Sequence, residues 1–207
     1  MRSRTIGLIL AGGEARRFGG GKALAHLRGR PLVLWVREAL CPLCREIWLS
    51  LRHPGQTEGI LAREFTRVVL DPFPGEGPLS GILGGLRALA PGETLLVASC
   101  DQPLLKPALL QKLQIEFFRG DFWVGFCLNA RGQPEPFPGF YARELLPFLE
   151  EYLRRGKRSL REWFRSLPPS KILGLSAEAW YSLDDQGLTF LNINYREELE
   201  AIERFLS

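Results

Sequence analysis

The stretch Ile6–Lys22 reads "IGLILAGGEARRFGGGK": an apolar run, then a loop with five glycines, two adjacent arginines and one lysine. Successive glycines let backbone N–H groups turn toward an anion, and Arg17 and Lys22 can add charge-assisted contacts to phosphate oxygens. The stretch predicts a buried strand over Ile6–Ala11 that leads into a polyphosphate-binding turn. The alternative is a tight surface turn with solvated arginines.

The spacing of this loop excludes two familiar phosphate-binding motifs. A Walker A loop needs a glycine where Arg16 stands and a serine or threonine where Ala23 stands. The dinucleotide-binding fingerprint needs a glycine in place of Leu24. The sequence therefore favours neither a P-loop ATPase nor a dehydrogenase.

Apolar runs alternate with helical patterns through the first half of the chain. Strands are expected at 6–11, 47–51, 68–70 and 95–99, and helices at 31–40, 57–64, 79–90 and 106–118. This alternation predicts parallel βαβ units with helices on both faces of a sheet. Three of the strands end at Gly12, Asp71 and Asp101, and ligands bind at the carboxyl ends of such strands, so these residues should meet in one crevice.

The second half has a looser pattern. We expect a strand at 122–127, a Gly/Pro-rich stretch at 129–141, helices at 143–155 and 159–166, strands at 171–175 and 188–191, and a final helix from Arg196. A chain of 207 residues is most simply one domain. We assign about 1–120 to nucleotide binding and about 121–207 to acceptor binding.

Composition narrows the class of protein. The chain is 45% hydrophobic and 24% charged with a net charge of +4, which is ordinary for a globular protein. No apolar run approaches the roughly 20 residues that span a bilayer, and the aromatic residues are not interleaved with basic ones. We expect a cytoplasmic protein with no membrane or nucleic-acid partner. Cys41 and Cys44 lack the second pair or histidines of a metal site and are expected to be reduced thiols.

Several polar residues stand where chemistry is expected. Asp101 at a strand end suits Mg²⁺, which takes one or two carboxylates plus substrate phosphates, although aspartate also favours turns. Asp71 could contact a base or ribose, or shape its turn. Asn192 and Asn194 fall on one side of a strand-like run, or else cap the helix that follows. The basic stretch at 154–165 could bind an acceptor phosphate or an acidic partner, or form a solvated helix face.

Five segments together resemble the molybdenum cofactor guanylyltransferases, within the larger group of Rossmann-like nucleotidyltransferases. They are "LAGGEARRFGGGKAL", "LDPFPGEGPLSGILGGL", "ASCDQPLL", "YLRRGKRSLREWF" and "FLNINYREEL". The match runs in order across nearly the whole chain. It implies the three-layer α/β nucleotide-diphospho-sugar transferase fold with a mostly parallel central sheet.

The resemblance also implies a reaction and a set of site residues. A terminal phosphate oxygen of molybdopterin would attack the α-phosphorus of GTP, with Mg²⁺ (or Mn²⁺) as cofactor and pyrophosphate as the leaving group. The implied GTP-binding residues are Leu10, Ala11, Gly12, Gly13, Arg17, Lys22, Arg52, Asp71 and Asp101. Of these, Arg17, Lys22 and Asp101 are the implied catalytic residues, with Asp101 the metal ligand. The implied acceptor-binding residues are Arg158, Asn192 and Asn194.

Other functions remain open from the sequence. One is a cytidylyltransferase on the same acceptor, or another small-molecule nucleotidyltransferase; "LAGG" favours guanine because relatives that use CTP tend to read Ala-Gly at its last two positions. Another is a non-catalytic module for nucleotide binding or partner docking. The presence of both Lys22 and Asp101 favours an enzyme. Transient docking to cofactor-biosynthesis or acceptor proteins is expected as well.

Overall fold

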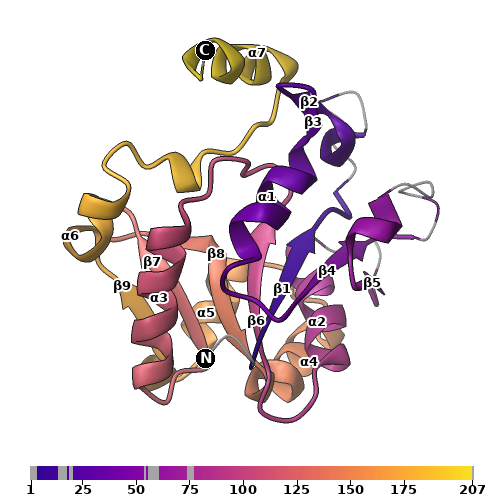
Figure 1. Ribbon diagram of the computed structural model, residues 1–207. Coiled ribbons are helices and arrows are strands. Elements are labelled where there is room, and N and C mark those ends of the chain that lie inside the picture. The colour runs from indigo at the N-terminus through magenta and orange to yellow at the C-terminus, as the bar shows by residue number, and fades with distance from the viewer. Residues whose placement is uncertain are drawn as a thin grey trace.

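The computed structural model describes residues 4–13, 18, 21–53, 55, 61–73 and 77–206. Its centre is a seven-stranded sheet with the strand order β5-β4-β1-β6-β8-β7-β9 (Figure 1). The pairs β5–β4, β4–β1, β1–β6 and β7–β9 are parallel, and only β8 runs against its two neighbours. The strands are β1 (Thr5–Leu10), β4 (Glu46–Leu51), β5 (Arg67–Leu70), β6 (Thr94–Ser99), β7 (Val124–Leu128), β8 (Pro134–Ala142) and β9 (Ile172–Leu175).

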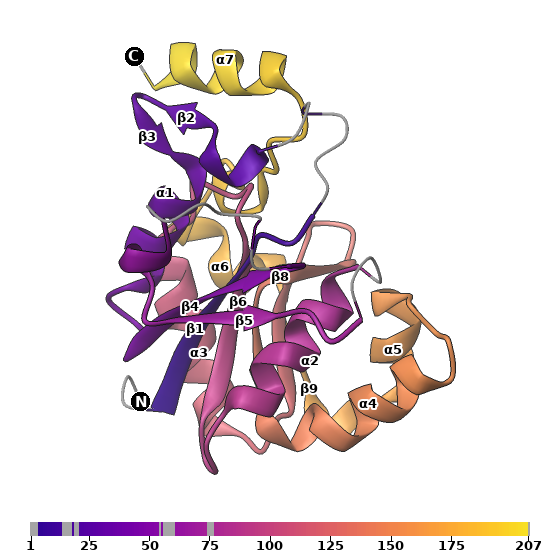
Figure 2. The same cartoon turned by 90° about the vertical axis from the view of Figure 1, so that its right-hand side faces the viewer.

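Helices cover both faces of the sheet, which confirms the three-layer prediction (Figure 2). One face packs against α1 (Leu32–Leu40) and α3 (Pro107–Arg119), and the other against α2 (Pro78–Ala88), α4 (Leu146–Arg154) and α5 (Leu160–Ser166). Neighbouring strand residues serve opposite layers: Leu8 belongs to the second cluster and Ile9 to the first. This alternation is the two-residue period of a strand, and it explains why these strands are apolar throughout.

The Gly/Pro-rich stretch forms most of β8, a nine-residue strand that was not predicted from the sequence. Its pairing with β6 is confined to Gly139–Ala142, which lies after the prolines at 134, 136 and 138. Proline has no backbone N–H and is therefore excluded from positions where a neighbouring strand needs that donor. Pro134 accordingly pairs with β7 alone, and Pro136 and Pro138 lie at the register shift between Glu135 and Gly139, outside the described pairing with β6 and β7.

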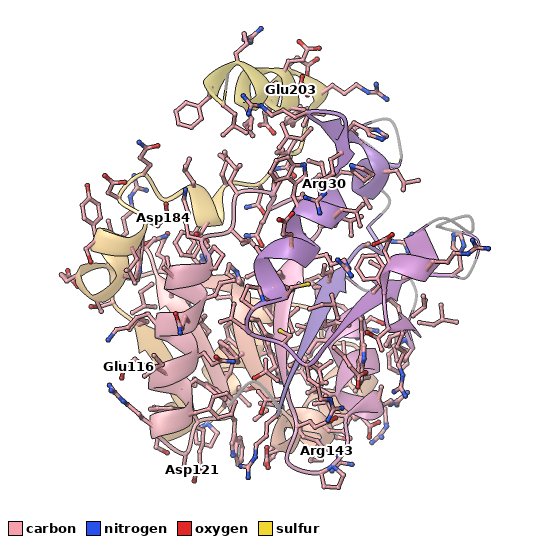
Figure 3. The ribbon with its side chains drawn as sticks, in the orientation of Figure 1. Arg30, Glu116, Asp121, Arg143, Asp184 and Glu203 are labelled. Atoms are coloured by element: carbon pink, nitrogen blue, oxygen red, sulfur yellow. The ribbon has the colours of Figure 1, made fainter. Side chains whose placement is uncertain are left out.

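The prediction of a strand at 188–191 is wrong, because this segment contains the 3-10 helix η9 (Leu188–Phe190). The Asp184 carboxylate accepts hydrogen bonds from the backbone N–H groups of Leu188 at 3.0 Å and Thr189 at 2.7 Å. Those donors are unavailable to a sheet. Asp184 lies in the C-terminal segment before α7 (Arg196–Phe205) (Figure 3). A short helix that the sequence did not predict, α6 (Ala177–Trp180), precedes it.

Of the helix expected at 57–64, the described part is a 3-10 helix, η5 (Leu61–Glu64), and residues 57–60 lie outside the described ranges. A small hairpin of β2 (His26–Leu27) and β3 (Arg30–Pro31) lies beyond one end of the main sheet, beside α7 (Figures 1 and 2). Within the described ranges, no helix combines the length and the apolar character needed to cross a membrane.

The C-terminal segment returns to the carboxyl ends of the central strands. Ile193 and Ile202 pack with Phe18, Leu27 and Leu32 in a third apolar cluster. The backbone N–H of Ile193 donates to the carbonyl oxygen of Asp101 at 2.9 Å. The last part of the chain is thus held beside the end of β6.

Candidate functional site

A cavity of about 670 Å³ opens where β1, β4, β5 and β6 end. This is the edge of the sheet at which the sequence predicts a crevice. Residues from the loop after β1, from the ends of the other strands, from the start of α2 and from the C-terminal segment line it. They include Leu10, Ala11, Gly12, Gly13, Lys22, Ser50, Arg52, Asp71, Gly81, Asp101, Phe137 and Asn194.

One wall of the cavity joins three segments that are far apart in the sequence. Lys22 Nζ donates to Asp101 Oδ2 at 2.5 Å and to Asn194 Oδ1 at 3.1 Å. The side chains of Lys22 and Asp101 are only 12% and 15% exposed, so water screens this ion pair weakly. Gly21, with φ of 62°, turns the chain into the 3-10 helix η3 (Lys22–Leu24). The result is a cation held at a strand end beside an amide.

The second oxygen of Asp101 suits a metal ion. Asp101 Oδ1 is buried and has no hydrogen-bond partner within the described residues. A buried carboxylate oxygen left without a partner is unfavourable, and such oxygens are ligands that Mg²⁺ prefers. The described part of the chain holds no cluster of three Asp, Glu, His or Cys side chains that could bind a metal alone. The geometry therefore fits a cation whose remaining ligands come from substrate phosphates and water.

The opposite wall carries Asp71, whose carboxylate is half-buried. Ser50 Oγ donates to Asp71 Oδ1 at 2.7 Å. A Cβ atom added to Gly12 would lie 2.8 Å from Asp71 Oδ2, and one added to Gly81 would lie 3.3 Å from Oδ1. Burial raises the pKa of Asp71 above its usual value, and the Ser50 hydroxyl and the positive charge of Arg52 partly oppose that rise. The carboxylate is thus confined between two glycines and held by one serine.

The structure brings most of the predicted site residues together. Among the cavity-lining residues are all the expected GTP-binding positions except Arg17, which lies outside the described residues. Arg158 and Asn192 do not belong to this lining. The Arg158 guanidinium donates to the carbonyl oxygens of Leu153 and Lys157, and Asn192 Nδ2 donates to the carbonyl oxygen of Phe190.

Of the two asparagines, only Asn194 lines the cavity. The strand expected at 188–191, which would have placed both side chains on one side, is absent. The backbone N–H groups of Asn194 and Tyr195 donate to Glu198 at 2.5 and 3.1 Å, and Tyr195 is the N-cap of α7. Glu198, and not an asparagine side chain, therefore satisfies the start of this helix. The side-chain oxygen of Asn194 instead accepts the hydrogen bond from Lys22.

Sequence reasoning missed Ser50, Gly81 and Phe137 as lining residues. Ser50 carried a usable signal, because it is a lone hydroxyl within the apolar run Ile47–Leu51. Gly81 carried a weaker one, as one of three glycines in α2. Phe137 carried none, because it lies in the strand that was not predicted.

Two buried thiols, Cys100 in the cavity lining and Cys127 in β7, are held protonated. Burial raises the pKa of Cys100, next to Asp101, to about 12, and burial raises that of Cys127 to about 12 as well. A thiolate is the reactive form of cysteine, so these two side chains are inert at neutral pH. Cys41 is the C-cap residue of α1.

Comparison with known proteins finds the same kind of protein with a family model and with individual relatives. Residues 7–171 match the family described as MobA-like NTP transferase domain. The probable molybdenum cofactor guanylyltransferase of Bacillus licheniformis is 30% identical over 206 residues, covering 98% of each chain. The molybdenum cofactor guanylyltransferase of Cereibacter sphaeroides is 34% identical over 212 residues, covering 98% of this chain and 97% of the relative.

Solved structures support the same fold. Molybdopterin-guanine dinucleotide biosynthesis protein A from Archaeoglobus fulgidus superposes with a TM-score of 0.82 at 26% identity, covering 97% of this chain and 98% of that one. A 4-diphosphocytidyl-2C-methyl-D-erythritol synthase from Anaerococcus prevotii shares the fold, with a TM-score of 0.72 at 14% identity. Together with the match to residues 7–171, these similarities show that the chain belongs to the MobA-like NTP transferase family.

Proposed function

We propose that the protein transfers GMP from GTP to the terminal phosphate of molybdopterin, giving the guanine dinucleotide and pyrophosphate. The observation that carries this proposal is the meeting of Lys22, Asp101 and Asn194 in the lining of a cavity that also holds Asp71. The similarity to molybdenum cofactor guanylyltransferases over nearly the whole chain supports the choice of donor and acceptor. Residues 1–207 would act as one unit, with the acceptor approaching from the C-terminal half.

In this proposal the chain binds and orients two anionic reactants. The loop Leu10–Gly13 holds the nucleotide, with Arg17 and Lys22 at the triphosphate and Asp71 and Arg52 at the nucleoside. Asp101 would hold Mg²⁺, which when bound neutralises charge on the phosphate oxygens. Asn194 faces the acceptor phosphate, and Asn192 and Arg158 contact the acceptor farther out.

The transfer needs little covalent work from the protein. An acceptor phosphate oxygen forms a bond to the α-phosphorus, and the bond from that phosphorus to the bridging oxygen breaks, so that its electron pair leaves with pyrophosphate. A phosphate monoester is already ionised at neutral pH, so no side chain must remove a proton from it. Lys22 stabilises the negative charge that develops on the leaving group, and alignment of the reactants supplies much of the remaining acceleration.

Nucleotide selection and metal removal test this proposal. With molybdopterin and Mg²⁺ present, GTP should release pyrophosphate and CTP or ATP should not, in a coupled pyrophosphate assay. EDTA in excess should abolish the release and added Mg²⁺ should restore it, because a single carboxylate plus substrate phosphates holds the ion weakly. Pyrophosphate release that is unchanged in EDTA would refute the role of the metal.

Gly81→Ala is expected to impair GTP binding more than it impairs folding. The new Cβ would lie 2.6 Å from Ser50 Oγ and 3.3 Å from Asp71 Oδ1, so the Ser50–Asp71 pair must move. Gly85→Ala is a matched control, since its Cβ would lie 2.6 Å from Leu8 Cδ2 in the apolar core. Overpacking should destabilise both variants by about 1–3 kcal/mol. Calorimetry should show weaker GTP binding for Gly81→Ala alone; equal affinities for the two variants would contradict this reading.

A further inference from the structure

The hydroxyl of Ser50 has a single described partner in the cavity wall. Ser50 lies in β4, between β1 and β5, and its side chain is buried. Its carbonyl oxygen accepts from the N–H of Ala11 at 2.9 Å, which joins β4 to the loop after β1. Its hydroxyl donates to Asp71 Oδ1 at 2.7 Å. A buried serine in an apolar strand, with its proton directed at a cavity-lining carboxylate, is more than a packing residue.

The carboxylate that Ser50 binds has little room to adopt another orientation. A Cβ on Gly12 would lie 2.8 Å from Asp71 Oδ2, so the missing side chain of Gly12 leaves space for this oxygen. Gly81 leaves the corresponding space beside Ser50 Oγ and Asp71 Oδ1. The backbone N–H of Asp71 donates to the carbonyl oxygen of Leu51 at 2.9 Å, which fixes the root of the side chain. Four residues, from the loop after β1, from β4 and from α2, thus set the direction of one carboxylate.

We propose that Ser50 is a positioning residue for nucleoside recognition, and that its hydroxyl orients the Asp71 carboxylate to accept from N–H or O–H donors of the nucleoside. This inference rests on the proposed function. A carboxylate is an acceptor only, so it selects a donor-bearing edge. In GTP the candidates are the N1–H and 2-amino group of guanine and the ribose hydroxyls.

The charged groups around Asp71 define how the site should respond to pH. Arg52, after β4, lowers the pKa of Asp71, and His53 follows it in the cavity lining. The lining residues at the end of β1 and the start of α2 carry no charge: they are Gly12, Gly77, Pro78 and Gly81. The charged pair of Lys22 and Asp101 belongs to the wall at the end of β6. Loss of the Ser50 hydrogen bond removes one influence that holds the pKa of Asp71 down. As the pH falls, the Asp71 carboxylate should then become protonated, and nucleoside recognition should be lost, at a higher pH than in the wild type.

Ser50→Ala tests the inference by calorimetric titration with MgGTP between pH 5 and 8, combined with steady-state kinetics. We expect the Kd at pH 7.5 to rise roughly tenfold, as for loss of a hydrogen bond to a charged group. The kcat at saturating GTP should stay within about twofold, because the interaction is made equally in the ground and transition states. As the pH falls, binding should be lost at a higher pH than in the wild type. His53 is present in both proteins and does not contribute to this difference.

Ser80→Ala is the matched control. Ser80 is also fully buried, but its hydroxyl accepts from the N–H of Phe73 at 2.8 Å and does not contact Asp71. It should lower the Tm while leaving the pH midpoint of GTP binding unchanged. ITP, which lacks the 2-amino group, and 2′-deoxy- and 3′-deoxy-GTP identify the donor: the analogue whose affinity responds least to Ser50→Ala lacks the group that Asp71 binds.

The possible results separate the inference from the function on which it rests. If Ser50→Ala binds GTP with the wild-type Kd and pH midpoint, the positioning role is overturned and the proposed function stands. If Ser50→Ala behaves like Ser80→Ala, with a lower Tm and no shift of the midpoint, Ser50 is merely structural. Failure of the wild-type protein to bind GTP would overturn both.

Discussion

Asp101→Asn should lower kcat/KM for GTP by about 10²–10³-fold, the loss typical of removing one preorganised electrostatic contact. Asparagine keeps the shape of the side chain but removes the charge that holds Lys22 Nζ at 2.5 Å and the anionic oxygen that suits a metal ion. Electron paramagnetic resonance of Mn²⁺ should show weaker metal binding in the presence of GTP. The defect would thus lie in assembly of the metal–nucleotide complex.

Asp121→Asn is the control for this variant. Asp121 pairs with Lys171 outside the cavity lining and is 89% exposed, so its loss should leave kcat/KM unchanged. Mn²⁺ binding and turnover that survive in Asp101→Asn, within about threefold of the wild type, would remove Asp101 from the metal site.

Lys22→Met should cause the second large loss, again about 10²-fold or more in kcat/KM. Methionine keeps much of the apolar stem but has no charge to stabilise the leaving pyrophosphate. If the contact strengthens as the phosphorus–oxygen bond breaks, kcat should fall together with kcat/KM. Lys112→Met is the control, because Lys112 pairs with Glu116 on α3, away from the cavity.

The double variant Lys22→Met/Asp101→Asn distinguishes a joint role from two separate ones. Lys22 and Asp101 are in direct contact, and residues that act as a unit have non-additive effects. The double variant should therefore be little worse than the more damaged single variant. Losses that multiply would show that the two side chains act independently.

The first half of the fold could be predicted from the sequence for a physical reason. Parallel strands that are covered on both faces must be apolar throughout, so β1, β4, β5 and β6 appear as short apolar runs between helical patterns. The carboxyl ends of such strands share one edge of the sheet, and for this reason the sequence predicts that Gly12, Asp71 and Asp101 lie in one crevice.

The second half of the chain was less predictable, because its elements depend on contacts between residues far apart in the sequence. β8 is a strand despite its prolines, since only the residues after them, Gly139–Tyr141, pair with both β6 and β7. The contact of Lys22 with Asn194 joins residues 172 positions apart. The two-residue period of the strand expected at 188–191 could not predict this contact. Asp184 accepts the backbone N–H groups of Leu188 and Thr189 in η9, which prevents a strand there.

The most direct test of guanylyl transfer is to identify the product formed in a single reaction mixture. The purified wild-type protein is incubated with Mg²⁺, molybdopterin and GTP labelled at the α-phosphate, and the products are separated and identified by mass spectrometry. We expect a labelled molybdopterin–guanine dinucleotide and an equimolar amount of pyrophosphate, both absent when CTP replaces GTP. A folded protein that forms no dinucleotide from GTP, or that forms one from CTP instead, would contradict the proposed function.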